Sequence, residues 1–526
     1  MTHRISMVML LVMGMSVVCI LTAQETPAEP ETPAAVAAKE APVDQVLEED
    51  FMGSQNQPER ASEAFSLKDI TLLTLKNNLN VQIKEKNPRI AQTDVVKAEA
   101  VFDPTVQASL SGGKTDTPAL GVGDSIEHDR AESTTGSAAL TKRFLTGTEA
   151  SVGVSASHSK GDDFDSSVSS QAGVEITHPL LKGGGVTVNE VDIFIARNNT
   201  RISQWDFKSQ VISTLAQSQT TYWELVFALE NLEVQKRSWR LSKKTLMQTE
   251  AQVEAGVLAR IEITRVRADV ASKEEGIISA QRAVEDQVDQ LRRFIRQSGS
   301  DLEDDTGIVP LERVAYEPVR LELKKEIRAG LLNRPDYMQA KIDTENRDLE
   351  IVRAKNGRLP QLDLKASVDV NGLGHGESNS FDSLGEGDFV DWNLGATFSY
   401  PLGNRAADAA YARAHWSMVQ SGLQVKNVAD QVVIDVKAAV RKVNADGQRV
   451  RSTRLARQLA EERLAAEEEK LNVGQAIILD LLEAQTLVAQ TEAAERRAIV
   501  DYQESLIQLE QAKGTLLESN HVFLAR

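Results

Sequence analysis

The stretch LNVGQAIILDLLEAQTLVAQ (residues 471–490) interrupts a long helical pattern with a glycine and then continues it. No proline occurs between about Ala406 and Asn472, so the chain before this glycine is typical of one very long helix. Gly474 breaks the pattern, because glycine is a poor helix former and a common helix terminator. An amphipathic helix resumes beyond it, with an apolar side formed by Leu481, Leu482, Val488 and Ala489. We therefore predict a helical hairpin whose turn lies at Gly474.

This turn belongs to an internal repeat. At an offset of 218, VEAGVLARIEITRVRAD (253–269) aligns with LNVGQAIILDLLEAQTL (471–487), and their glycines coincide. At an offset of 256, residues 77–109 align with 333–367, the second segment being two residues longer. The change of offset means that the first copy holds 38 additional residues. Each copy is predicted to be one helix, strands, a long helix and a further helix.

The N-terminus is typical of an export signal. A short positive start is followed by an apolar run that ends at Ala23, although a membrane anchor is the competing interpretation. Cys19 lies in this run with poor lipoprotein cleavage residues before it. The predicted organisation is a signal peptide (1–23), a flexible Pro/Ala/Glu-rich leader (24–63), a first repeat (64–300), an inter-repeat linker and equatorial segment (301–332) and a second repeat (333–520).

Two regions show the two-residue period of strands, at about 104–178 and 361–400. Each run has one apolar side, which suits a membrane β-barrel, although a soluble sandwich shares the pattern. Loops rich in Gly, Asp and Ser are predicted at 113–133, 159–169 and 371–387. In the last run, the predicted lipid-facing residues are Val390, Trp392, Leu394, Phe398 and Tyr400. One chain has too few strands to close a barrel, so we expect closure by oligomerisation.

Helix boundaries also follow from the sequence. Ser66 followed by Asp69 is a capping-box pattern, and predicts a helix that runs to about Val101. A second proline-free run spans about Asn189 to Glu254. Within it, a coiled-coil spacing is followed by Val211, Leu215, Ser218, Tyr222, Leu225, Leu229, Leu232 and Trp239.

Composition and motifs exclude several functions. The formal net charge is −18 and the basic residues are scattered, which argues against a nucleic-acid partner. The seven histidines have no metal-ligand spacing, and neither HExxH nor GxSxG occurs. We expect no catalytic residues, no metal, no cofactor and no enzymatic activity.

The order of these features resembles the TolC-type outer-membrane efflux proteins, or outer membrane factors, over about residues 66–519. The resemblance is carried by Leu75-Lys76-Asn77-Asn78-Leu79, Phe102-Asp103-Pro104, His178-Pro179-Leu180-Leu181 with Gly183-Gly184-Gly185, Asn333-Arg334-Pro335-Asp336, Val473-Gly474 and Asp480-Leu481-Leu482-Glu483-Ala484-Gln485.

The resemblance implies an α+β membrane protein, a homotrimer with two structural repeats per chain. Its strands would form one shared β-barrel in the outer membrane of a Gram-negative cell, in contact with lipid. Its helices would continue this barrel as a long α-helical coiled-coil barrel in the periplasm. It also implies a periplasmic adaptor (membrane fusion protein) and, through it, an inner-membrane pump. The function implied is a passive conduit for drugs or secreted polypeptides in a tripartite efflux or type I secretion system. The alternative is a structural, periplasm-spanning coiled-coil protein without a pore.

Two sets of site residues follow from the resemblance. In the family a Val-Gly turn at the periplasmic tip contacts the adaptor. Val473, Gly474 and Gln475 match that turn, whereas the first copy has Gly256 and Val257 after an alanine and so departs from it.

The second set is acidic. Asp480 and Glu483 share a helix side and match an acidic ring at the family's periplasmic aperture, with Glu262 at the corresponding place in the first copy. In a trimer such rings attract cations. The alternative is a solvated helix side whose acids are favoured by the helix dipole. Ala476 stands where the family's best-known member has an arginine, although Arg260 could serve.

Members of the family usually have four strands per chain, and this chain departs from that number in its first strand region. Its 38 additional residues predict two more strands, joined by the turn Leu145-Thr146-Gly147. Six strands per chain would give eighteen per trimer instead of twelve, unless the additional hairpin folds into the lumen.

Overall fold

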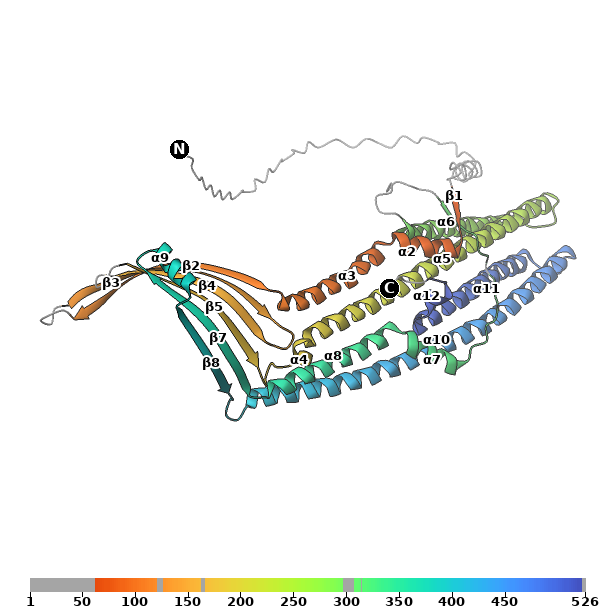
Figure 1. Ribbon diagram of the computed structural model, residues 1–526. Helices are drawn as coiled ribbons and strands as arrows, with labels where there is room; N and C mark the ends of the chain where they lie inside the picture. The colour runs from red at the N-terminus through yellow and green to blue at the C-terminus, as the bar shows by residue number, and fades with distance from the viewer. Residues whose placement is uncertain (1–61, 121–125, 162–165, 297–306, 314, 523–526) are drawn as a thin grey trace, which may run out of the picture. The chain divides into compact units, whose positions relative to one another are not determined.

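The computed structural model describes residues 62–120, 126–161, 166–296, 307–313 and 315–522 (Figure 1). The predicted signal peptide, Cys19 and nearly all of the predicted leader lie outside these ranges. The strands are β1 (Ser62–Phe65), β2 (Thr105–Leu120), β3 (Ile126–Arg143), β4 (Glu149–Gly161), β5 (Ser167–Pro179), β6 (Gly307–Pro310), β7 (Gln361–Gly374) and β8 (Phe389–Ser399). The helices are α2 (Leu67–Asn77), α3 (Leu79–Glu99), α4 (Val186–Asn189), α5 (Val191–Glu254), α6 (Ile261–Ile295), α7 (Leu323–Asn333), α8 (Pro335–Gly357), α9 (Glu377–Glu386), α10 (Arg405–Asn472), α11 (Ile478–Lys513) and α12 (Leu516–Ser519), with a short 3₁₀ turn at Ala100–Phe102.

Six strands form one antiparallel sheet in the order β2-β3-β4-β5-β7-β8. The six strands predicted for the two strand regions are therefore present in one sheet, and the turn between β3 and β4 lies where the sequence placed it. The predicted loops were partly wrong. Residues of the 113–133 segment extend β2 to Leu120 and begin β3 at Ile126, and α9 occupies much of 371–387. A small parallel sheet pairs β1 with β6.

The long helices are confirmed at α5 and α10, which have 64 and 68 residues and so extend about 100 Å each. The seam residues Val211, Leu215, Tyr222 and Leu225 are buried in α5. None of the described helices is both long and apolar enough to cross a membrane.

The first predicted helix is wrong in one respect, because it is broken in two. The capping box of Ser66 and Asp69 is present at the start of α2. However, α2 ends at Asn77, and the Asn78 side chain accepts hydrogen bonds from the N–H groups of Asn80 and Val81 to start α3. An asparagine cap satisfies the free N–H groups of a new helix, so the break costs little. The same break recurs 256 residues later between α7 and α8.

The helices pack as a wall that continues from the sheet (Figure 1). Next to the sheet, α5 packs between α3 and α8, and α10 packs on α8. Further along, α5 packs between α6 and α11, and α11 packs on α10. One core gathers around Tyr222 and Leu215 of α5, and a second around Val436 of α10 and Tyr502 of α11.

Candidate functional site

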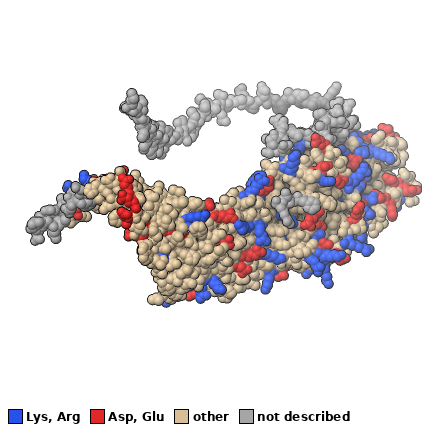
Figure 2. Space-filling model, viewed as in Figure 1, with Lys and Arg blue, Asp and Glu red and all other residues tan. Residues whose placement is uncertain are grey.

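The six-stranded sheet has two chemically different sides. Its register places Val106, Leu140, Val152, Val174, Val368 and Trp392 in one row across all six strands. These side chains share one side of the pleat and are between 44% and 78% exposed. In Figure 2 the sheet is mostly tan, apart from a column of acidic side chains toward its end away from the helices, whereas charged side chains cover the helices. An exposed apolar patch of this extent marks a surface that contacts a membrane or another protein.

The opposite side of the sheet is polar. One row runs through Ser109, Ser137, Ser155, Gln171 and Asn371. An ion pair lies on this side, where Lys365 Nζ is 2.8 Å from a Glu175 carboxylate oxygen. Asn371 also donates to Asp391 at 2.8 Å. A groove of about 840 Å³ lies on this side near the end of the sheet away from the long helices.

The residues predicted to face lipid lie on the apolar side of β8. Val390, Trp392, Leu394 and Phe398 alternate with polar residues along the strand and are at least 52% exposed. Tyr400 follows the end of β8 and is 42% exposed.

The two edges of the wall carry exposed apolar stripes. At about 100° per residue, the exposed apolar residues of α10 all fall within a sector of about 60°. They are Trp416, Val419, Leu423, Ile434, Leu455 and Leu459. On α3, Leu79, Ile83 and Ile90 form a similar stripe, and each is at least 54% exposed. These stripes were not singled out from the sequence, because only the packing shows which sides of the helices lack a neighbour.

The two predicted tip turns have the same backbone structure. Gly256 and Gly474 end α5 and α10 with φ of +73° and +74°, a conformation that favours glycine. The next residue donates in each case to a carbonyl five residues back, Val257 to Gln252 at 2.8 Å and Gln475 to Lys470 at 2.7 Å. Both turns lie at the ends of the long helices that point away from the sheet (Figure 1).

The predicted acidic residues begin the helices that follow these turns. Asp480 accepts a 3.4 Å hydrogen bond from the Ile477 N–H, so it helps to start α11. Glu262 lies 2.6 Å from Arg265 on the same helix, a partner that the i, i+3 spacing could have indicated. Glu483 is exposed. The structure therefore brings Asp480 and Glu483 onto one helix side, opposite the buried Ile478, Leu481 and Leu482.

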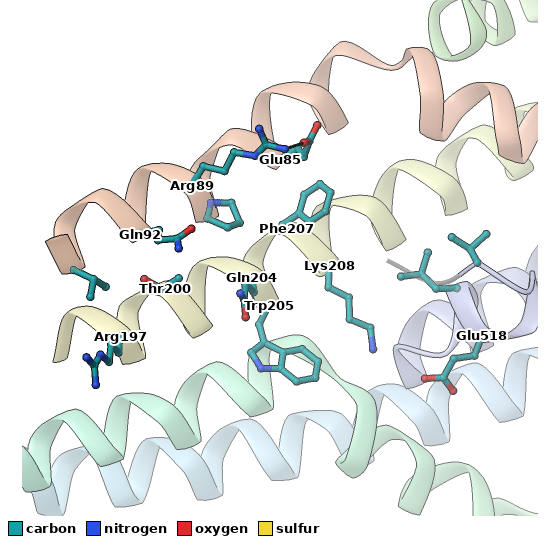
Figure 3. Close-up of a pocket in the computed structure, with 14 residues that line it drawn as sticks. Glu85, Arg89, Gln92, Arg197, Thr200, Gln204, Trp205, Phe207, Lys208 and Glu518 are labelled. Atoms are coloured by element: carbon teal, nitrogen blue, oxygen red, sulfur yellow. Dashed lines mark hydrogen bonds and ion pairs between the residues drawn. The ribbon is translucent and has the colours of Figure 1, made fainter. Parts of the chain in front are cut away.

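A larger groove, of about 1200 Å³, lies between α3, α5 and α12 (Figure 3). The Lys208 ammonium lies 5.1 Å from the centre of the Trp205 ring, and burial lowers the pKa of Lys208. Glu518 approaches from α12. Sequence reasoning missed this groove because its three walls are distant in sequence. Among the described residues, no group of acidic, histidine or cysteine side chains could hold a metal ion.

A charged cluster ties α5 to α11 within the wall. Arg497 of α11 donates to Glu224 of α5 at 2.6 Å and lies 2.7 Å from Asp501. Glu504 is buried beside them, and its Oε1 has no hydrogen-bond partner among the described residues. Burial, reinforced by the negative charge of Glu224, raises the pKa of Glu504 to about 7.

This cluster should make stability depend on pH. Because the folded-state pKa of Glu504 exceeds its ordinary value of 4.5, stability falls as pH rises from about 4.5 towards 7. Glu504→Gln removes that penalty, so at pH 8 this variant should melt at a higher temperature than the unmodified protein. Its free energy of unfolding should be higher by at most about 3 kcal/mol. The difference should vanish at pH 5. Glu224→Gln, which weakens the bond to Arg497, should destabilise instead. Equal melting curves for Glu504→Gln and the unmodified protein at pH 8 would contradict the assignment.

Comparison with known proteins agrees with this arrangement. A family model described as outer membrane efflux protein matches residues 72–295 and 327–515. The outer membrane protein TolC of Escherichia coli is 22% identical over 323 residues, 60% of this chain and 64% of TolC. TolC of Vibrio cholerae is 25% identical over 304 residues, 57% of this chain and 67% of that protein. These matches thus span about two thirds of each relative's length. The Campylobacter jejuni CmeC outer membrane channel superposes with a TM-score of 0.60 over 86% of both chains at 15% identity, which is a likeness of fold.

Proposed function

The chain belongs to the outer membrane efflux protein family, and from that premise we propose that it is the outer-membrane channel of a tripartite efflux or type I secretion system. It is a passive conduit for drugs or secreted polypeptides, and has no catalytic residues of its own. The observation that carries the proposal is the sheet whose exposed side is apolar across all six strands while its other side is polar. Such a sheet suits a barrel wall between lipid and water.

The barrel is closed by three copies. β2 and β8 are the two edges of the sheet, and they run in opposite directions, so β8 of one copy can pair antiparallel with β2 of the next. The α10 stripe would then pack on the α3 stripe of that neighbour. A head-to-tail contact of this kind closes into a ring. The helical part extends through the periplasm.

The tips at Gly256 and Gly474 meet the periplasmic adaptor, through which an inner-membrane pump supplies the energy. The shared backbone structure of the two turns supports an equivalent contact in both copies. In the second copy the contact would be made by Val473, Gly474 and Gln475, which match the family turn more closely. In the first copy it would be made by Gly256 and Val257. A structural coiled coil without a pore leaves the apolar side of the sheet without a partner.

Planar-bilayer recording tests this proposal. Protein extracted from the outer-membrane fraction should run as a trimer and give discrete conductance steps. Well-folded trimers that insert into the bilayer and yet conduct no ions would overturn the channel and favour the structural alternative.

We infer that Asp480 and Glu483, with Glu262, form acidic rings at the periplasmic aperture. Asp480→Ala combined with Glu483→Ala should then reduce cation selectivity and weaken block by divalent cations, because confined carboxylates attract cations. Reversal potentials in a salt gradient measure the change. Glu483→Ala alone should give part of the effect without removing the hydrogen bond at Ile477. Asp286→Ala, at an exposed acid further along α6, is the charge control. A selectivity equal to that of the control refutes the ring.

A further inference from the structure

We propose that the β3–β4 hairpin forms part of the barrel wall, so that three chains close an eighteen-stranded barrel instead of placing these hairpins in the lumen. The inference rests on the proposed trimeric channel. Four of the six strands continue directly into the wall helices, because α3 leads to β2, β5 to α5, α8 to β7 and β8 to α10. β3 and β4 are the two strands without a helix of their own, so they are the additional pair.

The side-chain pattern of the additional strands is that of a wall. β3 carries Leu140 and β4 carries Val152 and Val154 on the sheet side that bears Val368, and these three are 47%, 51% and 48% exposed. Their polar neighbours, such as Ser137 and Ser155, lie on the other side. A hairpin folded into a water-filled lumen would expose these apolar side chains to water, which is unfavourable.

The pairing is continuous on both sides of the additional strands. β3 pairs with β2 over Ile126–Thr141, and β4 pairs with β5 over Glu149–Ser159, with no bulge in either ladder. Removing the hairpin from the wall would break both ladders. Exposed backbone groups of a broken ladder are not tolerated within a bilayer.

The turn between β3 and β4 is fastened to the bend between β5 and α5. The Gly185 N–H donates to the Thr146 carbonyl at 3.0 Å, and Arg143 donates to Asn189 at 2.8 Å. Thr148 and His178 share a 2.8 Å hydrogen bond. These contacts hold the turn at the junction of sheet and helices, where a wall strand must end.

The consequence is a wide pore at the outer membrane. With strands about 4.8 Å apart and tilted by about 40°, eighteen strands give a barrel about 36 Å across, against about 24 Å for twelve. The cross-section roughly doubles, so the barrel accommodates bulky cargo such as polypeptides.

Single-cysteine labelling tests the wall position. In a Cys19→Ser background, Leu140→Cys and Val154→Cys are labelled with bimane in proteoliposomes. Quenching by nitroxide lipids is then compared with quenching by aqueous iodide. Val368→Cys on β7 is the reference for the lipid side, and Ser155→Cys is the control for the lumen side. Size-exclusion chromatography first confirms that each labelled variant remains a trimer.

We expect nitroxide lipids to quench the bimane at Leu140→Cys and at Val154→Cys by the same factor as the bimane at Val368→Cys. The bimane at Ser155→Cys should instead be quenched by iodide. If Val368→Cys alone is quenched by lipid, the hairpin lies in the lumen and this inference fails while the channel stands. If Val368→Cys is also quenched only by iodide, the proposed membrane barrel itself fails.

Discussion

Val368→Arg is expected to prevent assembly of the protein into the outer membrane. Val368 lies in the apolar row at the middle of β7, 52% exposed, between Val174 and Trp392. An arginine facing the middle of a bilayer costs about 2–4 kcal/mol in a membrane barrel, and a trimer would incur this three times, about 6–12 kcal/mol. The net stability of a folded protein is typically only about 5–15 kcal/mol, so this cost is comparable to the whole of it. The amount of trimer in the outer-membrane fraction measures the effect.

The neighbouring position provides the matched control. Ser367 has the opposite orientation and pairs across the ladder with Glu175, so Ser367→Arg places its charge on the polar side beside a carboxylate. We expect near-normal assembly of this variant. Equal assembly of the two variants would contradict the assignment of the sheet sides.

Gly147→Ala is expected to disrupt the junction between sheet and helices. Gly147 has a φ of +88°, and a Cβ atom there would lie 2.3 Å from the Gly183 carbonyl oxygen and 2.9 Å from the Pro179 ring. A left-handed conformation costs a non-glycine residue about 1–3 kcal/mol, and the clash with backbone adds to it. We expect a loss of about 3 kcal/mol or more, seen as a lower melting temperature and less trimer.

Gly256→Ala distinguishes the cost of the left-handed backbone conformation from the cost of the steric clash. Gly256 also has a positive φ, +73°, but an added Cβ meets nothing within 4 Å. This variant should show only the smaller, conformational loss. If Gly147→Ala is no more harmful than Gly256→Ala, the turn has room to move and is not fastened to the bend at Gly183.

Local sequence was sufficient wherever local chemistry sets the structure. The Ser66–Asp69 capping box, the proline-free runs of α5 and α10 and the two-residue period of the strand regions were predicted from residue order alone. The break at Asn78 was missed, yet its counterpart in the second copy is visible as Pro335 at the start of α8. Proline favours the first turn of a helix, so the repeat itself held the signal.

Other errors came from segments whose composition misleads. The 113–133 segment was interpreted as a loop, but the structure pairs its described residues, 113–120 and 126–133, as strands. Cross-strand ion pairs such as Lys114–Glu132, at 2.7 Å, stabilise that part of the hairpin. Residues 377–386 form α9 because Gly372 and Gly374 leave room for it, and the buried Ser380 bonds to Ser170. Neither arrangement can be predicted from a short window of sequence.

The sequence by itself determined the helical hairpins, their glycine turns at Gly256 and Gly474, and the alternation of the strands. These depend on backbone preferences and on periods of a few residues. Only the tertiary structure decided that six strands share one register, that their apolar residues form one row, and that the turn at Gly147 is fastened to the bend before α5. Such features depend on contacts between residues far apart in the chain, and alternation within one strand does not specify which strand lies beside it.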